Sequence, residues 1–334
     1  MPRFLCLTCR RTFSRQTFST SYYLKRPELL APLAAALQAG GALRQIARTL
    51  ACAHSTTARL AARLGRHAML LHARAMSFLA GRHAEPVVLD HFETFEFSQD
   101  LPFGVATPVG SLSWFVYGLD PAPHARAGRL TEAQRERLRR RPRRTAFGGY
   151  RGSTRRVVRL LLPLVPERRR LRLVGDGHPA YDDVVGHHPF VRLERFPNPK
   201  RGPRGAPRSA EAVARDRAMF ASDLLHALLR HTLAHHRRET IAFGRRLNAL
   251  IERLALMAVW RNFVKRRSER RPVPVTPAMQ VGLAAEVWDW QRVLSRRLFP
   301  GRESLSRAMA RLYRRDWTTP IYPRNTRHQL KHAY

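Results

Sequence analysis

Acidic side chains are scarce in this sequence. Its 334 residues include 61 lysines and arginines but only 24 aspartates and glutamates, which gives a formal net charge of +37. An acid among apolar neighbours is therefore conspicuous. Asp90 follows Val87-Val88-Leu89, and Asp176 ends an apolar run that begins at Leu171. Carboxylates are the ligands that Mg²⁺ prefers, and two such ions about 4 Å apart can activate an attacking oxygen and stabilise a leaving one.

A third acid would have to come from the C-terminal helices. Asp223 lies in an apolar stripe and is the first choice, and Glu239 is the second. Glu239 and Glu252 could instead pair with neighbouring arginines. Asp90 could equally be an exposed residue of an alternating strand, and Asp176 could only shape the turn at the following glycine.

The elements that would position these acids follow from periodicity. Short strands are expected at 86–97, 105–107, 112–119, 171–176 and 190–196, and helices at 154–164, 209–238, 248–267 and 276–297. An antiparallel meander, a crossover, a strand ending in an acid and a long helix are the order of an RNase H-like core. The expected fold class is therefore mixed α/β, with acids at the carboxyl ends of strands, where such sheets hold ligands.

A helical region precedes this core. After Gly40-Gly41 the sequence predicts a short helix, a tight turn and a longer basic helix, which is the layout of a helix-turn-helix. The alternative is an ordinary three-helix cluster. If the region binds DNA, the residues facing it are Thr56, Thr57, Arg59 and Arg63.

The N-terminus contains a C-x-x-C pair, Cys6 and Cys9, which can supply half of a tetrahedral zinc site. The sequence has no second pair with this spacing, so a truncated half-ribbon without zinc is the favoured alternative. The expected division is 1–26 for this half-ribbon, 27–82 for the helix-turn-helix, 83–270 for the catalytic domain with a basic insertion at about 125–170, and 271–334 for C-terminal helices and a basic tail.

The positive charge predicts a polyanionic partner, because phosphate contacts relieve self-repulsion and release counterions. A high-GC genome would explain the preference for arginine over lysine better than the shortage of acids. No apolar run reaches the roughly 18 residues that span a bilayer, and no signal peptide is evident, so a cytoplasmic, nucleoid-associated protein is expected. The arginines suited to phosphate contacts are Arg230, Arg237, Arg238, Arg245 and Arg246.

Three segments resemble bacterial insertion-sequence transposases of the DDE type. Residues 5–18 (LCLTCRRTFSRQTF) resemble the second half of their zinc ribbon, and 171–181 (LRLVGDGHPAY) resembles their second-acid segment. Residues 225–246 (LHALLRHTLAHHRRETIAFGRR) resemble their arginine-rich helix with its T-I-A-F turn.

The resemblance implies an RNase H-like fold, a two-metal Mg²⁺ site, cleavage and transfer of DNA strands, and several copies assembled on double-stranded transposon ends and target. It assigns the first acid to Asp90 and the second to Asp176. The chain departs from the pattern by placing Asp223 where a glutamate is expected, and by lacking the first cysteine pair. Two alternatives remain open: a catalytically inactive, transposase-derived DNA-binding protein, and a basic RNA-binding protein whose acids do not converge.

The charge excess makes the first prediction. Affinity for a labelled duplex, measured by fluorescence anisotropy, should fall by at least about 100-fold between 50 and 200 mM salt if several phosphates are contacted. A flat dependence on salt would contradict binding that is dominated by phosphate contacts.

Overall fold

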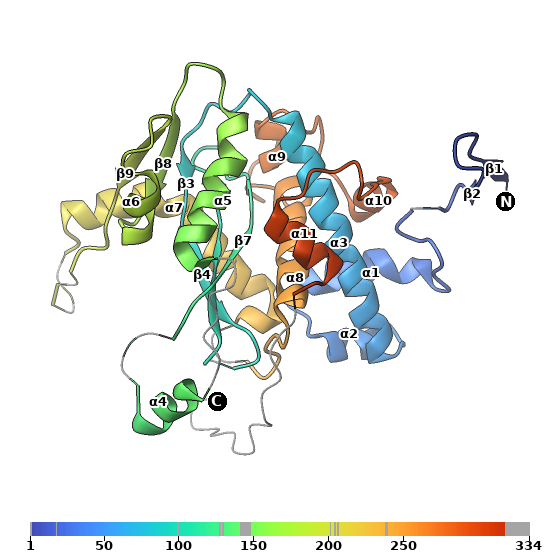
Figure 1. The fold of residues 1–334 in the computed structure, drawn as a ribbon, viewed down its shortest axis with the longest axis horizontal. Coiled ribbons are helices and arrows are strands. Elements are labelled where there is room, and N and C mark those ends of the chain that lie inside the picture. Colours follow the sequence, from blue (N-terminus) through green and yellow to red (C-terminus); the bar gives the residue numbers. More distant parts are fainter. Residues whose placement is uncertain are drawn as a thin grey trace.

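The central sheet has four strands in the order β6–β3–β8–β9 (Figure 1). These strands are β3 (Val87–Val88), β6 (Val109–Gly110), β8 (Leu171–Gly175) and β9 (Val191–Arg195). β3 is antiparallel to β6 and parallel to β8, and β8 is parallel to β9. The computed structural model describes residues 2–17, 19–98, 100–126, 128, 130–140, 148–200, 202–203, 205, 207–237 and 240–317. The mixed α/β class expected from the sequence is confirmed.

A second, antiparallel sheet continues from the first. It consists of β4 (His91–Phe95), β5 (Pro102–Ala106) and β7 (Asp120–Pro123), in the order β4–β5–β7. Only Leu89 and Asp90 separate the end of β3 from the start of β4. The Thr107 amide donates to the Asp90 carbonyl at 2.9 Å. This hydrogen bond continues the antiparallel pairing across the gap between β3 and β4. Asp90 thus lies where the chain passes from one sheet to the other.

Three helices cover these strands. α5 (Gly149–Leu161) packs on β5 and β7, α6 (Pro179–Val185) connects β8 to β9, and α7 (Ala210–Thr232) packs against β3, β6 and β8. Ser209 begins α7 as the sequence predicts, because its hydroxyl accepts the Ala212 amide at 3.2 Å and satisfies an unpaired donor of the first turn.

A layer of helices forms the other half of the protein. α3 (His54–Phe78) and α8 (Leu247–Val259) lie side by side (Figure 1), with α1 (Leu30–Gln38) and α2 (Leu43–Thr49) packed against α3. Gly65 permits the close approach of α3 to α8, because a Cβ atom there would lie 2.4 Å from the Glu252 carbonyl oxygen. One hydrophobic core includes residues of these helices and of both sheets, so it is continuous across the predicted boundary at residue 82.

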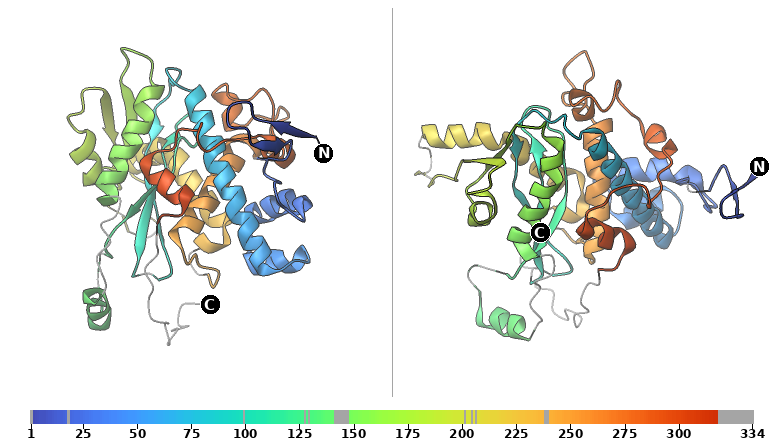
Figure 2. Two further views of the ribbon diagram at one scale, coloured as in Figure 1. Left: turned by 45° about the vertical axis from the view of Figure 1, so that its right-hand side comes forward. Right: turned by 45° about the horizontal axis from the view of Figure 1, so that its top comes forward.

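The remaining elements are peripheral. The hairpin of β1 (Arg3–Leu5) and β2 (Thr12–Ser14) and the helix α4 (Glu132–Arg139) project from the body (Figure 2). Three short helices follow α8: α9 (Pro277–Gln280), α10 (Trp290–Ser295) and α11 (Arg307–Arg314). Shorter 3-10 or π segments span Pro27–Leu29, Leu162–Leu164, Ala234–His236 and Trp260–Val264. Within the described ranges, no helix is both long and apolar enough to cross a membrane.

Three predicted elements differ from the structure. Residues 112–119 form a turn and a single bridge rather than a strand, because the Glu85 carboxylate accepts the Leu112 and Ser113 amides at 2.7 and 2.8 Å. The helix predicted over 276–297 is two short helices, since α9 ends close to Gly282, whose φ is +74°. The helix predicted at 154–164 begins earlier, at Gly149, within the segment expected to be a peripheral insertion.

The contact at Gly65 yields a prediction. Gly65→Ala should lower the free energy of unfolding by about 1–3 kcal/mol, since the added methyl group forces two packed helices apart. Chemical denaturation measures the effect. Gly301→Ala is the matched control, because a Cβ there meets nothing within 4 Å. Equal stability of the two variants would contradict the close approach.

Candidate active site

The first two predicted acids meet at one edge of the central sheet. β3 and β8 are parallel, with Val88 paired to Val174, and the Leu89 amide donates to the Val174 carbonyl at 2.8 Å. Asp90 lies two residues after Val88, and Asp176 lies two residues after Val174. The register therefore places the two acids side by side at the carboxyl ends of neighbouring strands.

The electrostatics of Asp90 reflect this proximity. Burial raises its pKa first, and the Asp176 carboxylate raises it further, to about 7. The Asp223 carboxylate also raises it, although the His91 amide, which donates to Asp90 Oδ1 at 2.7 Å, and Arg215 act in the opposite direction. The three acids predicted from the sequence therefore influence one site.

Asp223 is engaged by an arginine of its own helix. Arg215, two turns earlier on α7, forms an ion pair with Asp223, and its second nitrogen lies 3.4 Å from Asp223 Oδ1. Across the portion of the chain that is described, no group of three or more histidine, cysteine or acidic side chains could hold a metal ion. Asp223 is therefore a charged neighbour of the acid pair whose carboxylate is already matched by Arg215, and its role as a third metal ligand stays a prediction.

The acid pair fits a magnesium ion by its chemistry. Asp90 and Asp176 are carboxylates at adjacent strand ends, and their mutual repulsion is what a divalent cation relieves. Mg²⁺ is commonly bound by only one or two carboxylates, with water and substrate phosphates completing its coordination. Asp90 and Asp176 would hold it here.

A neutral histidine borders the pair. His226 on α7 has Nδ1 3.6 Å from Asp90 Oδ2 and Nε2 2.8 Å from the Thr107 hydroxyl. That hydroxyl donates to the Asp90 carbonyl, so Nε2 of His226 is the donor to it and Nδ1 is left without a proton. Burial, and secondly Arg230, lower the pKa of His226 to about 3. His226 therefore does not neutralise Asp90; it presents a proton acceptor to it.

A cluster of rings beside the acids was not predicted from the sequence. Tyr150, in the first turn of α5, stacks on His178, with ring centres 4.8 Å apart and planes 12° apart. Its hydroxyl donates to Glu93 on β4. His91 joins the cluster through Tyr181, whose hydroxyl lies 2.9 Å from its Nδ1. His91 could have been found from the sequence, because it directly follows the candidate acid Asp90. Tyr150 could not, because it lies in the segment predicted to be a peripheral insertion.

Two residues predicted to face DNA have structural partners. Thr57 is fully buried, and its hydroxyl donates to the His54 carbonyl at 2.8 Å, which stabilises the corner between α2 and α3. Arg63 donates to the carbonyls of Thr20 and Tyr22 at 2.9 and 2.7 Å and so fastens the N-terminal segment to α3. The prediction for Thr57 is wrong, because its side chain is buried in the core. Arg63 is half-buried and its guanidinium already has two carbonyl partners, so its contact with DNA stays a prediction.

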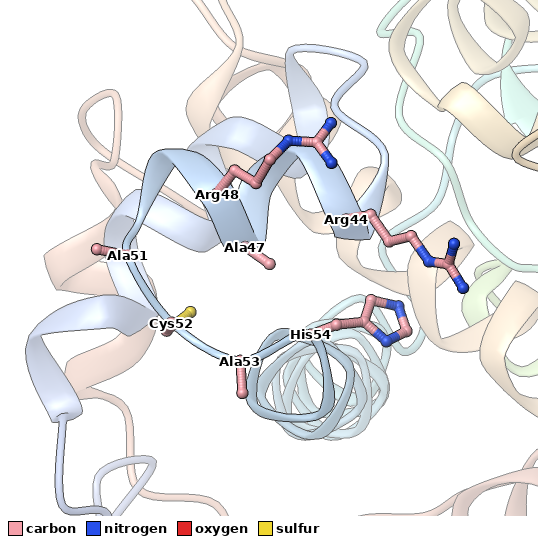
Figure 3. A pocket seen from close by; sticks show the side chains of 7 residues that line it. All are labelled: Arg44, Ala47, Arg48, Ala51, Cys52, Ala53 and His54. Carbon is pink, nitrogen blue, oxygen red and sulfur yellow. The ribbon is translucent and has the colours of Figure 1, made fainter.

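The exposed part of this corner is nevertheless basic. An open hollow lies between α2 and the start of α3, lined by Arg44, Ala47, Arg48, Ala51, Cys52, Ala53 and His54 (Figure 3). Arg44, Arg48 and His54 are exposed. Of the residues predicted to bind DNA, Arg59 is exposed and Thr56 is half-buried at the same end of α3.

The arginines predicted to contact phosphates divide into two groups. Arg230 lies 4.7 Å over the Phe92 ring and donates to the Glu93 and His236 carbonyls, each at 3.3 Å, so it fastens the end of α7 to β4. Three are exposed, namely Arg237, Arg245 and Arg246. Arg238 and Glu239, the second choice for the third acid, lie outside the described residues.

The other candidate ligands do not join the acid pair. Cys6 and Cys9 lie between β1 and β2 on the N-terminal hairpin, and hydrogen bonds from Cys9 lower the pKa of the Cys6 thiol. Cys52 lies at the hollow between α2 and α3. Glu252, on α8, is almost fully buried and forms an ion pair with Arg315 at 3.0 Å. It is a structural residue.

Comparison with known proteins adds no assignment, since no family model, no curated protein and no solved structure matches the chain. The site must be interpreted from its own chemistry.

The raised pKa of Asp90 makes a prediction about stability. The carboxyl group holds its proton up to about pH 7 when folded but loses it near pH 3.8 when unfolded. The contribution of the protonated Asp90 to the free energy of unfolding is therefore full below about pH 4, and it is lost as the pH rises through 7. Asp90→Asn, which mimics the protonated form, should stabilise the metal-free protein at pH 8 by on the order of a few kcal/mol, and little at pH 4.

Thermal or chemical unfolding at both pH values measures this difference. Glu211→Gln, which removes an exposed carboxylate from the start of α7, is the control. The electrostatic account of the site fails if Asp90→Asn is no more stabilising at pH 8 than at pH 4.

Proposed function

We propose that this protein is a DNA transposase of the DDE type, which cleaves and transfers DNA strands at the acid pair. The observation that carries the proposal is the in-register pairing of β3 with β8, which brings Asp90 and Asp176 together from positions 86 residues apart in the chain. When bound, Mg²⁺ would supply charge stabilisation for the attacking and leaving oxygens of the phosphodiester. The residues of the chain hold the carboxylates in place and partly bury Asp90.

The arrangement of strands supports the same proposal. With β3 and β4 taken as one bent strand, and β5 and β6 as another, the order across both sheets is β7–β5/β6–β4/β3–β8–β9. The first strands are antiparallel and the last two run parallel to β3, with α5 and α6 as the connections. This is the order of an RNase H-like core, and such a core places an acid on the first strand and another at the end of the fourth.

Double-stranded DNA is the proposed partner. The net charge of +37 favours a polyanion, and the hollow at the α2–α3 corner offers a concave basic surface. Arg44, Arg48, His54 and Arg59 replace Thr57 as the residues proposed to contact the DNA backbone there. The exposed Arg237, Arg245 and Arg246 remain candidates for phosphate contacts. Assembly of several copies on DNA remains part of the proposal.

A catalytically inactive, transposase-derived DNA-binding protein is the second candidate. The observation that favours it is the ion pair between Arg215 and Asp223, which neutralises the expected third acid.

The test measures strand cleavage of a plasmid that carries the gene with its flanking DNA. Asp176→Asn should reduce Mg²⁺-dependent cleavage by at least about 100-fold, since the cation loses one of two carboxylates, while DNA affinity stays the same or rises. Asp183→Asn, the same substitution at an exposed acid paired with Arg151, should cleave normally. A wild-type chain that binds DNA without cutting it with Mg²⁺ or Mn²⁺ would favour the inactive candidate.

A further inference from the structure

The ring of His178 is exposed and yet firmly held. Its own amide donates to Asp176 Oδ1 at 3.0 Å, and its Nδ1 accepts the Ala180 amide at 3.1 Å as the N-cap of α6. Gly177, with φ of +82°, allows the tight turn between the acid and the ring. Exposed side chains ordinarily keep their rotamer freedom, so a ring fixed next to a carboxylate is pre-organised for a contact.

The ring beneath His178 is supported in turn. Tyr150 stacks against His178 on one side and contacts the rings of His91 and His124, with centres 4.3 and 5.2 Å away. Gly104 leaves room for this arrangement, because a Cβ there would lie 3.3 Å from the Tyr150 hydroxyl oxygen. Tyr150 is therefore a rigid base for the exposed ring.

The stacked pair lies beside the acids. His178 follows Asp176 by two residues. The pKa of the Tyr150 hydroxyl is raised by burial first, then by Glu93, and also by Asp90 and Asp176, which places its ring within the field of the acid pair. A strand whose phosphate lay at Asp90 and Asp176 would carry its nearest base close to this pair.

Capping alone does not explain the ring. Asparagine or serine at position 178 would accept the Ala180 amide equally well, but neither would stack on Tyr150. Nucleobases that leave a duplex stack on aromatic and histidine rings, and such stacking tolerates any base because each has a flat π-face.

We propose that His178, backed by Tyr150, is a stacking site for an unpaired nucleobase next to the phosphodiester held at the acid pair. The inference rests on the proposed function. The site selects DNA whose end is opened over DNA that is fully paired, and it does so without reading the base sequence.

The experiment uses the full chain and 2-aminopurine, a base whose fluorescence is quenched by stacking. The probe is placed at the unpaired end of an otherwise double-stranded oligonucleotide, without divalent metal. The wild-type chain should quench the probe and bind the opened end more tightly than a blunt duplex. His178→Asn keeps the capping acceptor but removes the ring, so it should lose the quenching and at least about five-fold of that preference.

His187→Asn, the same substitution at an exposed histidine of the next loop, is the matched control and should behave as wild type. His178→Phe, which keeps a ring and loses the cap, should retain the quenching. Unchanged quenching in His178→Asn, loss of quenching in His178→Phe alone, or no quenching by the wild-type chain overturns the proposal. Because the probe assay needs no metal and no cleavage, its failure is separate from failure of the plasmid-cleavage test.

Discussion

The parallel pairing of β3 with β8 is the constraint on which the site depends. Five hydrophobic residues of these strands are buried, namely Val87, Val88, Leu171, Leu173 and Val174, and this burial fixes the register. A slip of one residue would exchange the two buried faces on which these side chains pack and would move the two acids out of register. Core packing therefore stabilises the close approach of two carboxylates, an arrangement that is electrostatically unfavourable by itself. The pKa of Asp90 is raised first by burial and then by the Asp176 carboxylate, in keeping with this cost.

The surroundings of the acids balance charge in two ways. Neutral rings and hydroxyls, among them His226 and Thr107, contact Asp90 without cancelling its charge. Arg215 instead neutralises Asp223 on the same helix. The result is a site with one desolvated acid, Asp90, beside Asp176, and a third acid already matched by a cation. This asymmetry is why the acid pair, and not the full triad expected from the sequence, carries the functional proposal.

Short-range patterns in the sequence predicted the fold class and the two acids of the pair. Contacts between segments far apart in the sequence could not be predicted from such patterns. A buried strand ending in Asp176 before Gly177 has a short-range signature, as does the Ser209 cap of α7. The turn at residues 112–119 has none, because its amides are satisfied by Glu85. Burial of α3 against α8 has no local signature either, because it depends on the close approach of Gly65 to Glu252 on a helix far along the chain. The burial of Thr57 at the α2–α3 corner was missed for the same reason. Tyr150 was missed because basic neighbours concealed a residue that packs inward.

The ion pair between Glu252 and Arg315 has a consequence for incomplete chains. Glu252 is buried in α8, close to the middle of the helical layer, and its partner comes from the residue that ends α11. A chain that stopped before Arg315 would leave Glu252 without its hydrogen-bonded ion-pair partner, with Arg66 and Arg253 left to offset the buried charge. Removing one partner of a buried ion pair typically costs about 3–5 kcal/mol. Native stability is only about 5–15 kcal/mol, so a truncated product would be a ready substrate for proteolysis. Completion of synthesis is thereby linked to survival of the folded protein.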